Sequence, residues 1–203
     1  MHIADGVLPF SIAAAGYALT VGGVGISLRM LHNDDLPKIA VATASFFVAS
    51  LVHLPLGPTS VHLLLPGIVG ALLGSAAFLS ITIGLFLQSL LFQFGGLTAL
   101  GANALMMGVP ALICGWLFRR IRGQTRTSNA IAGAMVSGLG TVLAACILAV
   151  LMMTAGEDFW GVAKVAVLAH IPVVVVETLV GGGIVSFLYQ VKPELLISRT
   201  VPG

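Results

Sequence analysis

The first two residues of the chain, Met1 and His2, carry the atoms needed to chelate a transition-metal ion. A bulky residue at position 2 is expected to prevent removal of the initiator methionine, which leaves a free α-amine. The Met1 amine, the His2 backbone nitrogen and the His2 Nδ1 can close fused five- and six-membered rings around one ion. Planar nitrogen coordination suits Ni(II) or Cu(II). Because the ligands must lose protons, binding should strengthen as the pH rises.

Three nitrogen ligands in one plane leave a fourth position open, and a distant histidine is the expected ligand. Two histidines bound the segment His53-Leu-Pro-Leu-Gly-Pro-Thr-Ser-Val-His62. The residue types alone leave His53 and His62 as alternatives. His53 could also orient His62, line an entry path, or be an ordinary loop residue.

Three further polar residues could support such a site from neighbouring loops. Asp5 could accept a hydrogen bond from the His2 ring, as acceptors commonly do beside metal-bound imidazoles, or it could be a turn acid. Gln93 and Asn103 flank a glycine-rich turn, where each could steady the N-terminal loop 1–10 or simply cap a helix. Asn103 is the better candidate of the two.

The composition restricts the elements that can position these residues. Only 8% of the 203 residues are charged and 58% are hydrophobic, whereas soluble domains carry about 25% charged residues. A chain this short cannot hide so much apolar surface in a soluble core. Because the apolar segments are continuous, helices are favoured over the alternating strands of a membrane barrel. We therefore expect an all-α membrane protein, a single transmembrane domain over 1–203, with lipid and not nucleic acid around it.

About seven segments are long enough to be transmembrane helices, since a helix needs roughly 20 apolar residues to cross a bilayer. They cover residues 11–30, 39–56, 63–79, 80–94, 99–118, 129–154 and 161–189. The third and fourth segments run together with few turn residues between them. No basic residue precedes the first apolar segment, so a cleaved signal peptide is not expected.

The basic residues predict the orientation of these helices. With seven spans and the N-terminus outside, eight of the nine Lys and Arg residues fall on the cytoplasmic side, as the positive-inside rule requires. These are Arg29, Lys38, Arg119, Arg120, Arg122, Arg126, Lys192 and Arg199, and Lys164 is the exception. The C-terminus is then cytoplasmic. Met1 and His2, the segment 53–62 and the turn 93–103 all fall on the outer side, where an imported solute arrives.

Several stretches of the sequence together resemble one family of membrane transport proteins. The start Met-His-Ile-Ala-Asp-Gly-Val-Leu-Pro is similar to the N-terminal signature of the CbiM/NikM family, the substrate-binding components of nickel/cobalt energy-coupling-factor transporters. The segment 53–62 is similar to the family's histidine motif. The likeness continues in residues 92–103, 169–177 and 192–196, and so covers nearly the full length.

The resemblance implies a seven-helix component whose extra N-terminal span carries a free end that closes the site. It implies Met1, His2 and His62 as ligands of Co(II) or Ni(II), and so prefers His62 to His53. The implied partners are a transmembrane coupling component and cytoplasmic ABC ATPases, possibly with a small accessory membrane subunit. The location would be the inner membrane of a prokaryote. The variants His53-Leu-Pro and Phe94-Gly-Gly of the family's motifs favour cobalt, for example for cobalamin synthesis.

The chain itself is not expected to be an enzyme or to hold a resident cofactor, the metal being the transported substrate. No GxxxxGK[ST] phosphate loop occurs in the sequence, so ATP hydrolysis would belong to the partner subunits. Three positions depart from the family's pattern. Phe94 stands where many relatives carry Asp or His, and Pro66 and Met106 stand where Asn is common. These departures bear on metal preference and affinity more than on the site itself.

Two ionisable residues, His170 and Glu177, lie inside the last apolar segment. Their spacing of seven residues places them on one helix face. We interpret them as an interhelical polar pair, with a role in transport as the alternative. Cys114 and Cys146 lie in apolar segments and are interpreted as packing residues. The alternatives to a transporter component are a self-contained carrier or channel for the same ions, a membrane metalloenzyme, and a scaffold that binds no metal.

Overall fold

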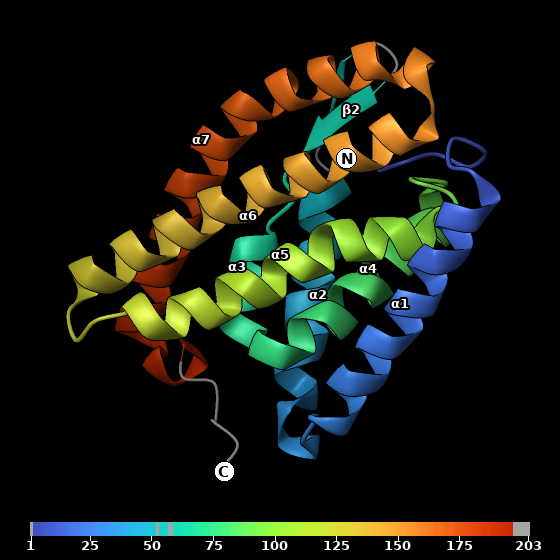
Figure 1. Cartoon of the computed structure of the whole chain (residues 1–203). Coiled ribbons are helices and arrows are strands. Elements are labelled where there is room, and N and C mark those ends of the chain that lie inside the picture. Colours follow the sequence, from blue (N-terminus) through green and yellow to red (C-terminus); the bar gives the residue numbers. More distant parts are fainter. Residues whose placement is uncertain (1, 52, 57–58, 197–203) are drawn as a thin grey trace.

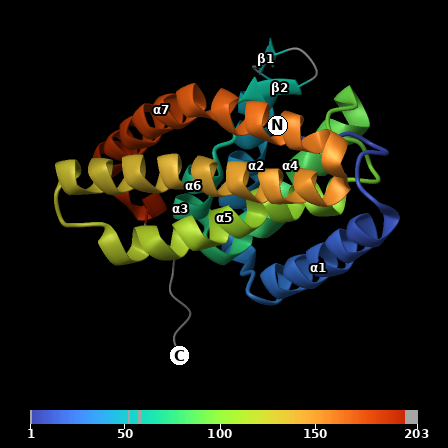
Figure 2. The same cartoon turned by 45° about the horizontal axis from the view of Figure 1, so that its top comes forward.

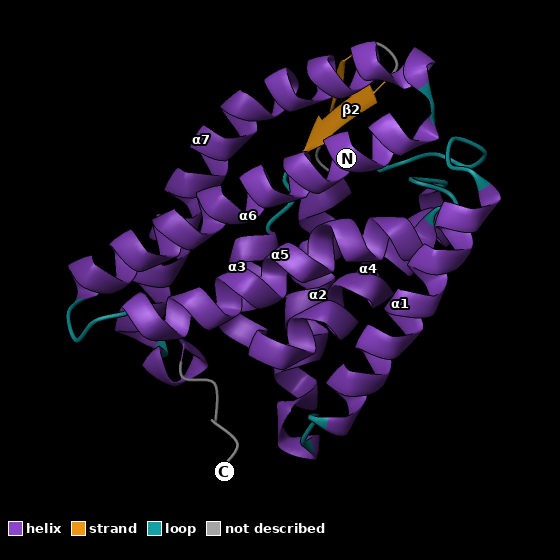
Figure 3. Ribbon diagram, in the orientation of Figure 1, coloured by secondary structure: helices purple, strands orange, loops and turns teal. Residues whose placement is uncertain are grey.

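The computed structural model describes residues 2–51, 53–56 and 59–196, and this part of the chain forms seven α-helices and one β-hairpin (Figure 1). The α-helices are α1 (Phe10–Arg29), α2 (Leu36–Leu51), α3 (Pro66–Leu73), α4 (Ala77–Phe92), α5 (Leu100–Ile121), α6 (Arg126–Ala155) and α7 (Trp160–Val191). Short 3-10 helices are η1 (Asn33–Asp35), η2 (Gly74–Ala76), η3 (Glu157–Phe159) and η4 (Pro193–Leu196). The strands β1 (His53–Leu56) and β2 (Thr59–His62) pair antiparallel, with His53 opposite His62. Figure 3 shows how completely helices dominate the fold.

Helix ends coincide with residues that cap a helix or cannot continue one. α6 begins after Thr125, whose hydroxyl accepts the Ser128 N–H at 3.1 Å, while the Ser128 hydroxyl accepts the Thr125 N–H at 3.2 Å. This reciprocal pair satisfies two backbone donors that the first turn leaves free. α3 begins with Pro66, whose fixed φ suits the first helical position. It ends at Gly74, where φ is +56°, a value that glycine adopts at little cost.

Two predicted boundaries are wrong. The second predicted span, 39–56, is too long, because α2 stops at Leu51 and residues 53–56 form β1. Pro55 within that segment lacks an N–H group and would clash with the preceding turn of a helix. The boundary between the third and fourth spans does not lie at 79–80, because η2 separates α3 from α4 at Gly74–Ala76.

Among the described residues, five helical segments are long and apolar enough to cross a bilayer, judged by length and composition. They are α1, the continuous stretch Pro66–Phe92, α5, α6 and α7. α2 has 16 residues, fewer than the roughly 20 that a span needs. The prediction of an all-α membrane protein is confirmed, apart from the short hairpin. Seven crossings and the orientation of the termini stay predictions.

Apolar and polar side chains are distributed as in a protein that lipid surrounds. Leu19 on α1 and Leu179 on α7 are 63% and 71% exposed. By contrast, Gln88, Asn103 and Glu177 are buried among the helices. Hydrocarbon solvates apolar side chains but not polar groups. Apolar side chains outside and polar side chains inside therefore fit a multi-pass membrane protein.

The loops gather at two ends of the helix bundle. At one end, the N-terminal segment contacts the α4–α5 connection, and the Tyr17 hydroxyl donates to the Leu97 carbonyl. At the other end, the Lys38 ammonium donates to the Leu195 carbonyl at 2.7 Å, and Arg122 donates to the Leu196 carbonyl at 3.0 Å. Figure 1 shows the N-terminus beside β2 and the C-terminal end at the far side of the bundle.

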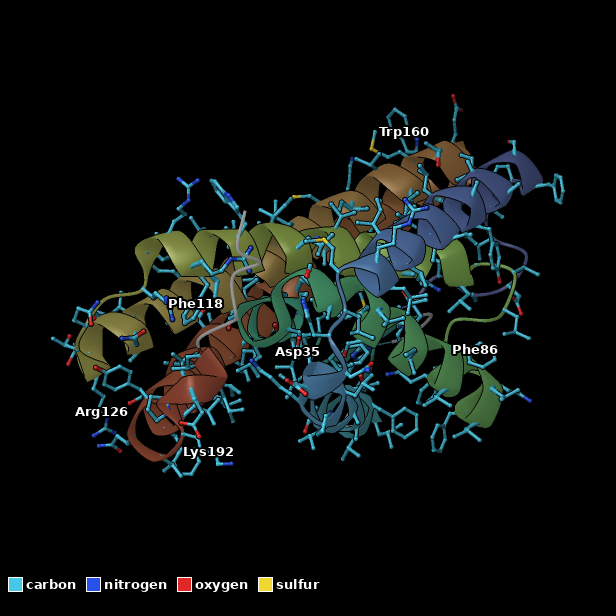
Figure 4. All side chains as sticks on the ribbon, turned by 90° about the horizontal axis from the view of Figure 1, so that it is seen from below. Asp35, Phe86, Phe118, Arg126, Trp160 and Lys192 are labelled. Carbon is cyan, nitrogen blue, oxygen red and sulfur yellow. The ribbon has the colours of Figure 1, made fainter. Side chains whose placement is uncertain are left out.

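Most of the basic residues lie at one of these two ends of the bundle. Arg29 ends α1, Lys38 lies in the first turn of α2, four arginines surround the α5–α6 connection, and Lys192 follows α7. All of them therefore lie at the end that carries η4. In Figure 4, Arg126 and Lys192 lie toward one end, whereas Trp160 extends outward at the other. Arg199 lies outside the described residues.

The short helix α3 lies at the centre of the bundle and leads directly from the hairpin. A Cβ atom added at Gly70 would lie 2.0 Å from the Ala111 carbonyl oxygen of α5, and one added at Gly115 would lie 2.4 Å from the Gly70 carbonyl oxygen. The two helix backbones therefore touch, as small residues allow in membrane bundles. Their contact fixes the depth at which the end of β2 enters the bundle. α6 and α7 run side by side along one flank, and α1 lies at the opposite edge against α5 (Figure 2).

Candidate metal-binding site

The imidazole rings of His2 and His62 lie side by side, although 60 residues separate them in sequence. Their centroids are 4.8 Å apart and their planes are inclined by 33°. His2 belongs to the extended N-terminal segment, and His62 is the last residue of β2. Figures 1 and 2 both show the N-terminal end beside this strand. His62, one of the two histidines that the sequence offered as partners, therefore has its ring against that of His2.

A backbone carbonyl determines which nitrogen of His62 is free. The Nδ1 atom lies 2.8 Å from the Leu63 carbonyl oxygen, and a carbonyl can only accept, so Nδ1 carries the proton. In the neutral ring Nε2 then presents a lone pair. This Nε2 atom is buried and makes no hydrogen bond within the described part of the chain, and the same holds for both ring nitrogens of His2. Because the neutral His2 ring has one N–H group and one lone pair, the two rings leave two lone pairs and one N–H group without a partner among the described residues.

Burial keeps both imidazoles in the neutral form that binds metals. It lowers the pKa of His2 to about 4, against a smaller opposing effect of the Gln88 side chain. Burial likewise lowers the pKa of His62 to about 4, opposed by its hydrogen bond to Leu63 and assisted by the nearby imidazole of His170. Because an ordinary histidine has a pKa of about 6.5, these two rings remain uncharged throughout the neutral range.

Asn103 holds the N-terminal segment in place. Its Oδ1 atom accepts the Ile3 N–H at 2.9 Å, and its Nδ2 atom donates to the Ile3 carbonyl at 3.0 Å. Asn103 is 2% exposed and lies in the first turn of α5. The residue directly after His2 is therefore fixed at both backbone polar groups. The sequence allowed Asn103 either to steady the N-terminal loop or to cap a helix, and these hydrogen bonds steady the loop.

Asp5 provides a second attachment of the same segment. Its Oδ1 atom accepts the Thr98 backbone N–H at 2.8 Å and also the Thr98 hydroxyl. The hydrogen bond from the Thr98 side chain lowers the pKa of Asp5, so the carboxylate stays ionised. The predicted hydrogen bond from the His2 ring to Asp5 is wrong, because the carboxylate faces the α4–α5 turn. Asp5 is a turn acid, the other role that the sequence allowed.

The glycine-rich turn lies directly over His2. Gly95 has φ +86°, and a Cβ atom there would lie 2.8 Å from the His2 Cβ. Gly96 has φ +76°, and a Cβ there would lie 2.2 Å from the Asp5 Oδ1. Both the conformation and the contact therefore require glycine. Gln93, the other predicted support, is the exposed C-cap of α4 and does not reach the His2 ring.

The sequence analysis missed Gln88, which lies beside the His2 ring from α4 and is fully buried. Its Nε2 atom donates to the Ser50 hydroxyl, and its Oε1 atom has no hydrogen-bond partner among the described residues. An amide oxygen at this place can accept from an imidazole N–H and so orient the ring. The available signal was an amide in the middle of the largely apolar segment 80–94, whose other amide, Gln93, lies near its end.

Glu177 fixes the segment that follows His62. Its Oε1 atom accepts the N–H groups of Leu64 and Leu65, the latter at 2.9 Å, and its Oε2 atom accepts the Thr141 hydroxyl at 2.5 Å. The predicted polar pair of His170 with Glu177 is therefore wrong. The His170 Nδ1 atom instead lies 2.6 Å from the Ala166 carbonyl oxygen, one turn earlier on α7. α7 thus holds the end of β2 through Glu177.

Two of the predicted site residues cannot be placed. Met1, with the α-amine that the chelate needs, lies outside the described residues. The backbone of His53 pairs with that of His62, but its side chain also falls outside the described part. Within the described residues, no three His, Cys, Asp or Glu side chains gather as a metal-binding group.

Comparisons with known proteins point to one family of transport proteins. Residues 2–195 match the family model of CbiM, described as the cobalt uptake substrate-specific transmembrane region. A Haemophilus influenzae protein provisionally named as a metal transport protein is 37% identical over 97% of each chain. The fused nickel transport protein NikMN of Rhodobacter capsulatus is 32% identical over 100% of this chain and 66% of its own length.

A solved structure shares the fold. The crystal structure of a transition metal transporter superposes with a TM-score of 0.76, covering 94% of this chain and 93% of that chain at 24% sequence identity. The Halobacterium salinarum protein provisionally named cobalt transport protein CbiM is 33% identical over 96% of each chain. These names include both cobalt and nickel, and so leave the choice between them open.

Replacing Gly95 by alanine tests whether the turn positions His2. We expect Gly95→Ala to weaken Co(II) or Ni(II) binding by about tenfold or more, because the new Cβ displaces the His2 side chain. Gly6→Ala is the matched control, since Gly6 also has a positive φ of +78° but faces nothing within 4 Å. Isothermal titration calorimetry and thermal unfolding of both variants provide the comparison. Equal losses of affinity would show that backbone strain, and not contact with His2, is responsible.

Replacing Asn103 by alanine tests the attachment of the N-terminal segment. Without the two hydrogen bonds to Ile3, we expect metal affinity to fall by about 10- to 100-fold, as when an outer support of a metal ligand is lost. Asn129→Ala is the control, because Asn129 is equally buried but bonds the Gly123 and Thr125 carbonyls at the opposite end. It should lower the melting temperature and leave the dissociation constant unchanged. Unaltered affinity in Asn103→Ala would contradict the proposed attachment.

Proposed function

We propose that this chain, which belongs to the CbiM family of cobalt uptake substrate-specific transmembrane proteins, captures Co(II) or Ni(II) on the outer side of the membrane for import. Its known relatives are transport proteins, so the chain is a transport component and not an enzyme. The metal ion is the transported substrate. Cobalt is the favoured ion, on the motif variants noted in the sequence.

The observation that carries this proposal is the pair of buried, neutral imidazoles of His2 and His62. The proposed ligands are the Met1 amine, the His2 backbone nitrogen, the His2 Nδ1 and the His62 Nε2. Four nitrogens of this kind suit a square-planar ion. Two observations support this set of ligands. The Nε2 atom of His62 presents a lone pair, and the hydrogen bonds between Asn103 and Ile3 fix the segment that carries the chelate.

The orientation that we propose places the N-terminus outside and the C-terminus in the cytoplasm. The basic residues at the η4 end support it through the positive-inside rule. The hairpin, the glycine-rich turn and the N-terminal loop then face the compartment from which the ion arrives. In a prokaryote this membrane would be the inner, plasma membrane.

Transport requires partners, because the sequence contains no phosphate-binding loop. We propose a transmembrane coupling component and cytoplasmic ABC ATPases as these partners, in an energy-coupling-factor transporter, with a small accessory membrane subunit as a further candidate. Ala40 and Ala44 support such an assembly, because both are exposed one helical turn apart on α2. Small residues at this spacing let a partner helix approach closely.

Adding one residue before Met1 tests the chelate. An alanine at that position turns the amine of Met1 into an amide, and we expect Co(II) or Ni(II) affinity to fall by more than about 100-fold. The matched control carries the extra alanine at the C-terminus. Metal analysis and titration of the two purified proteins give the comparison. Equal stoichiometric binding would overturn the proposed site.

Replacing His62 by alanine should lower the affinity for Co(II) or Ni(II) as much as the N-terminal extension does. His32→Ala is the control, because His32 is an exposed histidine near η1, and it should leave the affinity unchanged.

The number of protons released on binding tests the same site by another route. At pH 7 the Met1 amine is largely protonated, since such amines have a pKa of about 7.7–8.0, and the His2 amide must lose its proton. The imidazoles contribute none, because their pKa values are about 4. We therefore expect release of nearly two protons and an affinity that rises with pH between about 6 and 8. Calorimetry in buffers of different ionisation enthalpy measures this number, and a value near zero would contradict the chelate.

A further inference from the structure

His170 on α7 is a buried histidine to which the proposed chelate assigns no role. It is 1% exposed, and its Nε2 atom is buried without a hydrogen-bond partner among the described residues. Its Nδ1 atom lies 2.6 Å from the Ala166 carbonyl oxygen, which can only accept. Nδ1 therefore carries the proton of the neutral ring, and Nε2 presents a bare lone pair.

His62 has the same arrangement. In both residues a nearby backbone carbonyl fixes the proton on Nδ1 and leaves Nε2 free and buried. This is the usual preparation of a metal-binding imidazole, whose other ring nitrogen donates to a carbonyl or carboxylate. An interior nitrogen without a partner lowers stability, so a purely structural His170 would be expected to have Nε2 paired as well.

Helix α7, which carries His170, packs against strand β2, which ends in His62. Their relative position is also fixed. Glu177 lies two turns after His170 on the same face of α7, and its carboxylate holds the N–H groups of Leu64 and Leu65. The strand that carries His62 is therefore attached to the helix that carries His170, and not only to the N-terminal segment.

We propose that His62 and His170 form a second, weaker position for the transported ion, in which both Nε2 atoms bind Co(II) or Ni(II) and water completes the coordination. This inference rests on the proposed function, because His62 belongs to both positions. An ion that leaves the chelate of Met1 and His2 then stays attached to His62 while it gains His170. No ligand needs to change its protonation, since both imidazoles bind as neutral groups.

The test compares His2→Ala with the double variant His2→Ala/His170→Ala, using Co(II) as the probe. We expect His2→Ala to bind Co(II) weakly, with the absorption bands of nitrogen coordination, and the double variant to bind at least about tenfold more weakly still. His2→Ala/His32→Ala is the matched control and should behave as His2→Ala does.

The outcomes separate the two proposals. Tight binding by His2→Ala would overturn the chelate, whereas equal binding by His2→Ala and the double variant would overturn the second position. The difference in Co(II) affinity between those two proteins shows whether the second position exists, even if the chelate is disproved. Should His170→Ala fail to fold, His170→Gln keeps an N–H that can reach the Ala166 carbonyl and serves in its place.

A spectroscopic measurement needs no change at His170. In His2→Ala/His53→Ala protein, His32, His62 and His170 are the remaining histidines of the five in the sequence, and His32 is exposed at the other end of the bundle. Electron spin-echo modulation of bound Cu(II) reports the number of coordinated imidazoles. Two imidazoles are expected. A single one would overturn the His62–His170 position.

Discussion

The attachment of a chain end to the interior of a helix bundle is the constraint on which the whole site depends. Ordering a backbone residue costs roughly 1–2 kcal/mol, and an extended segment has no helical hydrogen bonds to offset this cost. Asn103 satisfies both backbone polar groups of Ile3, and Asp5 binds the Thr98 N–H. His2 is therefore held next to a fixed point, and its ring can stay 4.8 Å from that of His62.

The second histidine is held in an equivalent way. His62 ends a short strand, and the residues that follow it leave backbone N–H groups that no helix satisfies. In a membrane protein such groups need an internal partner, and the Glu177 carboxylate accepts two of them while Thr141 satisfies its other oxygen. The close contact of Gly70 with α5 fixes the depth of α3 below this point. Each ligand segment thus depends on one buried polar side chain of a helix.

Chemistry that depends on residue type could be predicted from the sequence, whereas chemistry that depends on helix packing could not. The chelating atoms of His2, the candidate partner His62 and the supporting role of Asn103 follow from residue types in loops, and the helical class follows from the apolar segments. Gln88 and Glu177 lie within apolar segments, and hydropathy does not tell which face of a helix meets which loop. The predicted His170–Glu177 pair fails because both residues find nearer backbone partners. The sequence did not reveal the hairpin, because the apolar residues of β1 continue the apolar segment that forms α2.

Under the proposed function, the bare ring nitrogens link metal binding to closure of the N-terminal segment. A buried nitrogen without a partner costs about 1–3 kcal/mol, and His2 and His62 bring three of them together. A bound ion removes this cost at the His2 Nδ1 and the His62 Nε2 only while the N-terminal segment stays clamped, so it stabilises the clamped state by its own binding free energy. The relation is reciprocal: whatever loosens Ile3 from Asn103 must weaken the hold on the ion. A coupling partner could therefore release the ion by moving α5 relative to the segment, without touching any ligand.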